Sequence, residues 1–182
     1  MTIYLQEGNL TIRKMEPPDG EALHNAFAAQ GWHKPLELFC TYLAQQEKGE
    51  KTVIVAEVSG SVAGYVALLP EAKTGPFACM GIPEIVDFNV LTKYQRQGIG
   101  GNIMDVAERM AAETSSRVSL AVGLHSGYGS AQRMYAKRGY IPDGSGVWYQ
   151  EKLLGQYAAC VNDDDLNLYL VKELWKVAED SR

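Results

Sequence analysis

A glycine-rich stretch between an expected strand and an expected helix constrains the fold of this chain more than any other feature. The segment YQRQGIGGNIM, residues 94–104, places three glycines in four positions and follows EIVDFNVL, residues 84–91, which has a strand pattern. Apolar residues at helical spacing continue to about Ser115, although glycine is a poor helix former. A loop without Cβ atoms lets backbone N–H groups converge, and the first turn of a helix adds unpaired N–H groups and partial positive charge. The stretch therefore predicts an anion site suited to a phosphate.

Two common phosphate motifs do not fit this stretch. The mononucleotide P-loop needs Lys-Ser or Lys-Thr after its second glycine, whereas Gly100 is followed by Gly101 and Asn102. The dinucleotide fingerprint needs a glycine where the chain has Ile103. A tight strand-to-helix turn that binds no ligand remains the structural alternative.

The pattern of apolar residues predicts a mixed α/β fold, with a central sheet of about six to seven strands and helices on both faces. At 182 residues, the chain is expected to form one domain, residues 1–174, followed by a polar C-terminal tail, residues 175–182. The predicted order is a strand at 9–15, helices at 19–30 and 35–46, two strands within 52–69, a strand at 84–91, a helix ending near 115, a strand at 117–124, a short helix at 130–139 and a final strand within 163–174.

Three details of this prediction concern loops and helix ends. The segment 71–83 is a loop long enough to suggest a functional role. Ser130 is the expected N-cap of the short helix, and Gly139 is its expected C-terminal stop. The segment 141–150 is expected to be rich in turns.

A third phosphate motif does fit. The pattern [Q/R]-x-x-G-x-[G/A] is matched by Gln95, Gly98 and Gly100, and it resembles the pyrophosphate loop of GNAT-family acetyltransferases. The later segment SAQRMYAKRGY is similar to the family's A-x-x-x-Y-x-x-x-G-[F/Y] helix at Ala131, Tyr135, Gly139 and Tyr140. The order of elements from residue 10 to residue 174 also resembles the GNAT fold.

The resemblance implies that the chain binds acetyl-CoA as a cosubstrate, with no metal. One departure is Tyr128, which stands where the family often has an asparagine that contacts the cofactor. The contacts there are expected to be rearranged, with Ser130 as a substitute. The implied cofactor-binding residues are Val90, Leu91, Gln95, Arg96, Gln97, Gly98, Ile99, Gly100, Gly101, Ser130 and Tyr135.

Three catalytic roles follow from the same resemblance. The backbone N–H of Val90, with Leu91 as its neighbour, is expected to hold the developing oxyanion. Tyr135 is the family-matching general acid for the leaving thiolate, and an amphipathic core tyrosine is the alternative. Glu84 is the first candidate for the base that receives the amine proton, because its spacing from Gln95 is similar to that of the base glutamate in the histone-acetyltransferase branch. An ordinary solvated glutamate is the alternative for Glu84, and Asp87 is the second candidate base.

Composition limits the partners. The formal net charge of −5 argues against non-specific nucleic-acid binding, which needs a basic face. The longest apolar runs are too short to span a membrane, and the N-terminus has no signal-peptide pattern. Three cysteines without paired spacing predict reduced thiols in a cytoplasmic protein. A homodimer is left open.

The sequence thus predicts an N-acetyltransferase that moves an acetyl group from acetyl-CoA to a primary amine by direct attack in a ternary complex. A small-molecule amine is the preferred acceptor, and a peptide or protein amine is the alternative. A non-catalytic acyl-CoA-binding sensor is the competing class, because it shares the glycine loop but needs neither Tyr135 nor a base.

Overall fold

The computed structural model describes residues 1–174, and the predicted polar tail, 175–182, lies outside the described residues. The contacts within the chain define two compact units. The first unit contains residues 1–69 and 85–110, and the second contains residues 70–84 and the chain from 111 onward.

The first unit is built on five strands in the order β1-β2-β3-β4-β5. Neighbouring strands from β1 to β4 are antiparallel and follow one another in the sequence. The strands are β1 (Ile3–Glu7), β2 (Leu10–Lys14), β3 (Thr52–Val58), β4 (Ser61–Leu69) and β5 (Glu84–Val90). The helices are α1 (Pro17–Ala29), α2 (Leu36–Glu47) and α3 (Ile99–Ala112), and a 3-10 turn spans Thr92–Tyr94.

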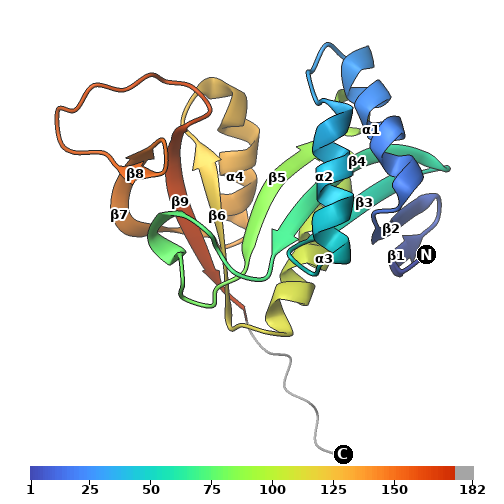
Figure 1. Cartoon of the computed structure of the whole chain (residues 1–182), viewed down its shortest axis with the longest axis horizontal. Helices are drawn as coiled ribbons and strands as arrows, with labels where there is room; N and C mark the ends of the chain where they lie inside the picture. The colour runs from blue at the N-terminus through green and yellow to red at the C-terminus, as the bar shows by residue number, and fades with distance from the viewer. Residues whose placement is uncertain (175–182) are drawn as a thin grey trace, which may run out of the picture. The chain divides into compact units, whose positions relative to one another are not determined.

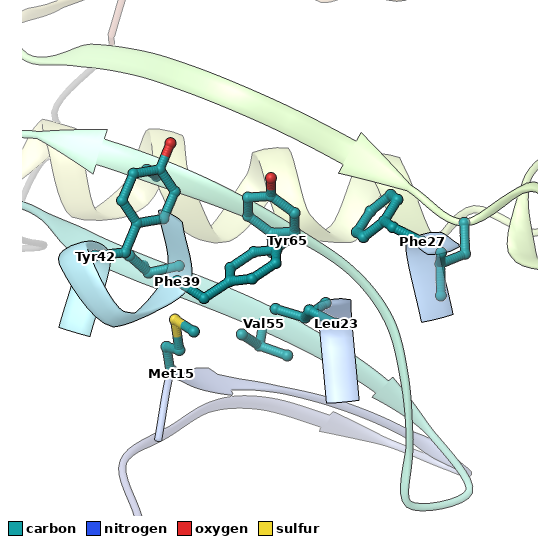
Figure 2. Close-up of a cluster of buried hydrophobic side chains, with 10 residues drawn as sticks. Met15, Leu23, Phe27, Phe39, Tyr42, Val55 and Tyr65 are labelled. Atoms are coloured by element: carbon teal, nitrogen blue, oxygen red, sulfur yellow. The ribbon is translucent and has the colours of Figure 1, made fainter. Parts of the chain in front are cut away.

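Helices cover both faces of these strands (Figure 1). Helices α1 and α2 pack on one face, where buried side chains from the helices and from β3 and β4 form an apolar cluster (Figure 2). Helix α3 lies on the opposite face (Figure 1), where a Cβ added at Gly100 would lie 3.1 Å from the Phe88 ring of β5. The cluster under α1 and α2 contains Met15, Leu23, Phe27, Phe39, Tyr42, Val53, Val55, Tyr65, Ala67 and Leu91.

A buried ion pair fixes the start of α1. Both side chains of the pair, Arg13 on β2 and Asp19 in the first turn of α1, are 6% exposed, and they meet at 2.6 Å. Asp19 also accepts a hydrogen bond from the N–H of Glu16, and Arg13 reaches Glu57 on β3 at 2.8 Å. Because a buried charge without a partner is costly, this network ties α1 to the strands.

The second unit has four strands in the order β6-β9-β7-β8, and each neighbouring pair is antiparallel. Its apolar cluster joins the 71–83 segment to β9 through Ala72, Phe77, Ile82 and Tyr169. The strands are β6 (Arg117–Gly123), β7 (Ile141–Tyr149), β8 (Lys152–Leu153) and β9 (Leu166–Glu173). The unit also contains α4 (Gly129–Lys137) and 3-10 turns at Gly75–Phe77 and Ser126–Tyr128.

The mixed α/β class is confirmed, but the nine strands of the described chain exceed the six to seven expected. The sequence did not predict β1 and β8, and segment 141–150, predicted as turns, contains β7. This strand is irregular between Pro142 and Val147, where Gly144 and Gly146 have φ of +91° and +97°. Glycines that allow a bulge are also typical of turns, which is why the sequence predicts turns where the structure has a strand.

Of the two predicted ends of the short helix α4, the N-cap is wrong and the C-terminal stop is confirmed. The prediction of Ser130 as N-cap is wrong, because α4 begins at Gly129 after Tyr128, which makes no side-chain capping bond. Gly139 does stop the helix, with a left-handed φ of +86° just past the C-cap Arg138. Only glycine adopts that conformation without strain.

Candidate active site

The predicted phosphate loop forms an exposed turn at the N-terminus of α3. Residues 95–98 are exposed, and Ile99, the first residue of α3, is buried. The backbone takes left-handed conformations at Arg96, with φ of +59°, and at Gly98, with φ of +84°. The carbonyl of Gly98 accepts a bond from the N–H of Asn102 at 3.1 Å, so the first intrahelical bond starts there. The N-terminal end of a 14-residue helix thus meets solvent at this loop, with the partial positive charge that suits an anion.

The three glycines serve different purposes. Gly98 allows the left-handed backbone, and an added Cβ would contact nothing within 4 Å. Gly100 allows α3 to approach β5, because an added Cβ would lie 3.1 Å from Phe88 and 3.5 Å from Val90. A Cβ at Gly101 would meet open space. Gly100 therefore permits the close packing of α3 on β5, and Gly98 permits the left-handed turn before the exposed end of α3.

Two glutamine side chains of the loop bond to nearby backbone. The Gln95 amide donates to the carbonyl of Val90 at 3.1 Å, and the Gln97 amide donates to the carbonyl of Lys93 at 2.8 Å. Both bonds span the turn between β5 and α3. They hold the loop in the shape that its backbone conformations define.

At the end of β5, the backbone N–H groups of Val90 and Leu91 point in different directions. The N–H of Leu91 donates to the carbonyl of Ala63 on β4 at 2.9 Å, so it is already used within the unit. Because successive peptide groups of a strand point to opposite edges, the N–H of Val90 points away from β4. The Val90 carbonyl, on that same edge, accepts the Gln95 bond. Of the two predicted oxyanion donors, Val90 is therefore the one whose N–H is not directed at β4.

Asp87, the second candidate base, is the centre of a polar cage that the sequence did not reveal. Its Oδ2 accepts from the hydroxyls of Tyr42 on α2 at 2.9 Å and Tyr65 on β4 at 2.5 Å. Its Oδ1 accepts from the ammonium of Lys34 at 2.5 Å and from the amide of Asn89 at 2.8 Å. The backbone at Asp87 has φ of +48°, an irregularity in β5 that accompanies this arrangement.

The cage holds Asp87 as an anion. Burial alone would raise the pKa of this carboxyl, but the charge of Lys34 and the hydrogen bonds from Lys34, Tyr65 and Tyr42 hold the pKa below its ordinary value. Burial and the Asp87 charge raise the pKa values of both tyrosines, so their hydroxyls stay protonated donors. A carboxylate with a lowered pKa is a weak base, which makes Asp87 a poorer proton acceptor than Glu84.

Glu84 has the opposite environment in the second unit. It is 6% exposed and makes no side-chain hydrogen bond or ion pair with the described residues. The preceding carbonyl, of Pro83, accepts from the N–H and hydroxyl of Ser119 on β6 at 2.9 and 3.1 Å. Burial and the nearby charge of Glu151 raise the pKa of Glu84 to about 7. A carboxyl with this pKa exchanges protons near neutral pH, as a general base requires.

Tyr135 lies on α4 in the second unit and is 5% exposed. Its ring packs edge-on against Tyr140 at 5.7 Å between centroids. Burial, with a smaller effect from Tyr128, raises the pKa of Tyr135, so the phenol stays protonated. Its hydroxyl makes no hydrogen bond within residues 1–174, which leaves that donor available to a ligand.

The departure at Tyr128 has a structural explanation. An added Cβ at Gly123 would lie 2.4 Å from the Tyr128 ring, so the ring occupies the space above that glycine. The Tyr128 hydroxyl donates to Asp164 at 3.0 Å, and His125 reaches the same oxygen at 3.0 Å. Ser130, the expected substitute, is exposed in the first turn of α4.

The structure divides the predicted site residues between the two units. The first unit holds the 95–101 loop and the end of β5, and the second holds Glu84, Ser130 and Tyr135. The Asp87 cage joins residues from α2, β4, β5 and the connection before α2, and no sequence motif marks them. An acidic residue within the apolar strand EIVDFNVL was the one available signal.

No helix within residues 1–174 is long and apolar enough to cross a membrane. In the same part of the chain, no group of three histidine, cysteine, aspartate or glutamate residues is placed to hold a metal ion.

Comparisons with solved structures place the fold. The chain is similar to Ard1 from Thermoplasma volcanium, at 20% identity and a TM-score of 0.66, over 93% of this chain and 100% of that one. It is similar to yncA from Salmonella typhimurium, solved with its cofactor acetyl-CoA, at 17% identity and a TM-score of 0.65, over 96% and 99%. The ribosomal-protein-S18-alanine N-acetyltransferase from Escherichia coli shares 13% identity and a TM-score of 0.65, over 95% and 99%. At these identities the likeness shows the fold alone.

Family membership comes from the sequence comparison. No curated protein matches the chain significantly by sequence. The family model described as an acetyltransferase (GNAT) domain matches residues 21–151, which is well over half of the chain. The chain therefore belongs to the GNAT acetyltransferases and is an acyltransferase.

Proposed function

We propose that this protein transfers an acetyl group from acetyl-CoA to a primary amine, most simply that of a small molecule. The observation that carries the proposal is the exposed N-terminus of α3 behind the left-handed turn at Gly98. The N–H groups of that helix end suit the pyrophosphate of coenzyme A. The relative yncA, whose structure contains acetyl-CoA, supports the same cosubstrate.

The reaction requires three contributions from the chain. The amine nitrogen bonds to the acetyl carbon while the carbon–sulfur bond breaks, so charge develops on the acetyl oxygen and on the sulfur. The N–H of Val90, directed away from β4, donates to the oxygen. The hydroxyl of Tyr135 donates to the sulfur, and the burial that keeps this phenol protonated suits it to that role.

Glu84 receives the proton that the amine loses. An amine is protonated at neutral pH and attacks only after deprotonation, so a base with a pKa near 7 is needed close to working pH. Glu84 has that pKa because it is buried and lies near Glu151. Asp87 is better suited to holding a cation than to accepting a proton, since its pKa is lowered.

The acceptor class is the open part of this proposal. Several structural relatives are named for ribosomal-protein acceptors, among them the ribosomal-protein-S18-alanine N-acetyltransferase. A peptide or protein amine is therefore the alternative acceptor. Family membership as an acyltransferase leaves no reason to retain the non-catalytic sensor. The cytoplasmic location and the oligomeric state remain predictions from the sequence.

A single assay tests the proposal. Purified protein is incubated with acetyl-CoA and with a panel of monoamines, diamines, aminoglycosides and amino-terminal peptides, and release of the coenzyme A thiol is followed. Amine-dependent release, with the acetylated amine identified by mass spectrometry, is the expected result. Absence of transfer to every amine, by a folded protein that binds coenzyme A in calorimetry, would overturn it.

A further inference from the structure

The carboxylate of Asp87 forms an ion pair with one side chain, Lys34, while the ammonium of Lys51 lies nearby without bonding to it. Of the four donors on its carboxylate, Tyr42, Tyr65 and Asn89 are neutral, and Lys34 is the one cation among the described residues that bonds to it. The neutral donors come from α2, β4 and β5, whereas Lys34 lies in the irregular connection between α1 and α2. The rigid elements therefore build an anionic cage, and a connecting segment supplies the cation.

The cage faces out of the apolar cluster. Figure 2 shows the hydroxyls of Tyr42 and Tyr65 pointing the same way, away from Met15 and Val55. The side chains of Lys34 and Asp87 are 22% and 20% exposed, so the ion pair is reachable from solvent. A soluble cation could displace Lys34 without opening the core.

The cage also has the chemistry that ammonium groups prefer. The Lys34 nitrogen lies 5.8 Å from the centre of the Tyr65 ring, in addition to its bond to Asp87. A second ammonium, of Lys51, lies 4.0 Å from the centre of the Tyr42 ring. Carboxylates and aromatic faces both attract ammonium ions. Two lysines of the chain thus already place their cations on this cage.

The cage lies a short distance along β5 from Val90, the proposed oxyanion donor. Asp87 precedes Val90 by three residues in β5, which spans ~10 Å in a regular strand at ~3.3 Å per residue. The left-handed backbone at Asp87 makes the strand irregular at this point. An acceptor that presents one amine at Val90 would carry a second cation to the cage if a short alkyl chain separated the two.

We propose that the Asp87 cage is a subsite for the second ammonium group of diamine acceptors, and that Lys34 occupies it as a tethered competitor. The proposal rests on the proposed acetyl transfer and adds the class of acceptor. A diamine binds with one ammonium in place of the Lys34 nitrogen and offers its other amine for reaction. A monoamine of the same length lacks the group that displaces Lys34.

Competition from Lys34 has a measurable consequence. When a site is open for only a fraction of the time, the apparent dissociation constant equals the intrinsic one divided by that fraction. Removing Lys34 takes away the ammonium that bonds to Asp87 while keeping Asp87, Tyr42, Tyr65 and the more distant ammonium of Lys51. We expect diamines to bind Lys34→Met about tenfold more tightly than wild type, and monoamines to bind equally well.

The experiment compares 1,6-diaminohexane with hexylamine on wild type, Lys34→Met, Asp87→Asn and a control, Lys48→Met. Lys48 is exposed beyond the end of α2, so its replacement changes the net charge equally without touching the cage. Calorimetry without acetyl-CoA gives the binding constants, and thiol release gives kcat/KM. The expected results are a stronger diamine preference in Lys34→Met, loss of that preference in Asp87→Asn, and no change in Lys48→Met.

The possible outcomes separate the two proposals. An unchanged ratio of diamine to monoamine constants in Lys34→Met would overturn the subsite, even if its melting temperature falls, because the ion pair would then be only structural. In another outcome, no amine is acetylated, but the preference for diamine binding rises in Lys34→Met and is lost in Asp87→Asn. The subsite then stands and the proposed acetyl transfer fails. Should Asp87→Asn not fold, Lys34→Met decides alone, since it retains the carboxylate.

Discussion

Glu84 and Asp87 show how strongly local surroundings set the behaviour of a carboxyl group. Both belong to β5, yet Asp87 has four hydrogen-bond donors and a lowered pKa, whereas Glu84 has none among the described residues and a pKa raised to about 7. One is therefore a fixed negative charge, and the other exchanges a proton near neutral pH. Residue type and spacing made both candidates for the base, and only their surroundings separate them.

Replacing Glu84 with glutamine tests its role as base. The change keeps the side chain's shape but removes the group that titrates at about 7. We expect kcat/KM to fall ~10²-fold or more. In wild type kcat/KM should rise with pH through about 7, and the variant should lack that acidic limb.

The measurement is a pH profile of thiol release with saturating acetyl-CoA. Glu21→Gln serves as the control, because it makes the same glutamate-to-glutamine change at an exposed residue of α1. Retention of both the rate and the acidic limb in Glu84→Gln would remove Glu84 from the mechanism.

Tyr135→Phe tests the proposed acid. The ring is buried against Tyr140, and phenylalanine keeps that contact, so stability should change little. Loss of a general acid typically lowers the rate ~10²- to ~10⁴-fold, and we expect the lower end because a thiolate leaves readily. Single-turnover kinetics should show the loss in the chemical step, with acetyl-CoA affinity nearly unchanged.

The matched control for this prediction is Tyr157→Phe, since Tyr157 is 96% exposed. A Tyr135→Phe protein that is stable and reacts at the wild-type rate, with chemistry limiting, would return Tyr135 to a packing role.

At the scale of elements, the sequence predicted regular segments well and irregular ones poorly. The sequence predicted helices α1 to α4 from apolar residues at helical spacing and from helix-end signals, and it predicted strands β2 to β6 and β9 from short apolar or alternating runs bounded by turn residues. Strand β7 was missed because its glycines permit a bulge and equally suit a turn. The phosphate loop was found because its glycines have a sequence pattern, whereas the Asp87 cage gathers residues from separate elements with no spacing to detect.

Gly98→Val tests the link between the loop and coenzyme A. The Cβ of valine would meet no atom within 4 Å, so the expected effect comes from the left-handed φ of +84°, which costs roughly 1–2 kcal/mol for an L-residue. The loop should therefore rearrange. We expect coenzyme A binding to weaken by at least tenfold in calorimetry.

Gly60→Val provides a close control, because Gly60 lies in the β3–β4 turn with φ of +77° and also has no atom within 4 Å of an added Cβ. The two variants should lose similar melting temperature, and only Gly98→Val should lose affinity. Equal coenzyme A affinity in the two variants would contradict the assignment of the loop.

At the scale of the whole molecule, Glu84 links folding stability to pH. Its pKa is 4.5 as an ordinary glutamate and about 7 in the folded chain, because burial and Glu151 disfavour the charged form. Between these values the folded state binds the proton more tightly than the unfolded state. The stabilisation is complete below pH ~4.5 and is lost as the pH rises through about 7.

Glutamine resembles the protonated carboxyl and does not titrate, so Glu84→Gln should lack this loss. Relative to wild type, we expect the variant to be equally stable near pH 4.5 and more stable at pH 8, by up to roughly 3 kcal/mol. Urea unfolding at both pH values measures the difference, and Glu21→Gln should follow wild type at each. Parallel stability curves for wild type and Glu84→Gln would mean that Glu84 titrates normally, and would also remove the physical reason for choosing it as the base.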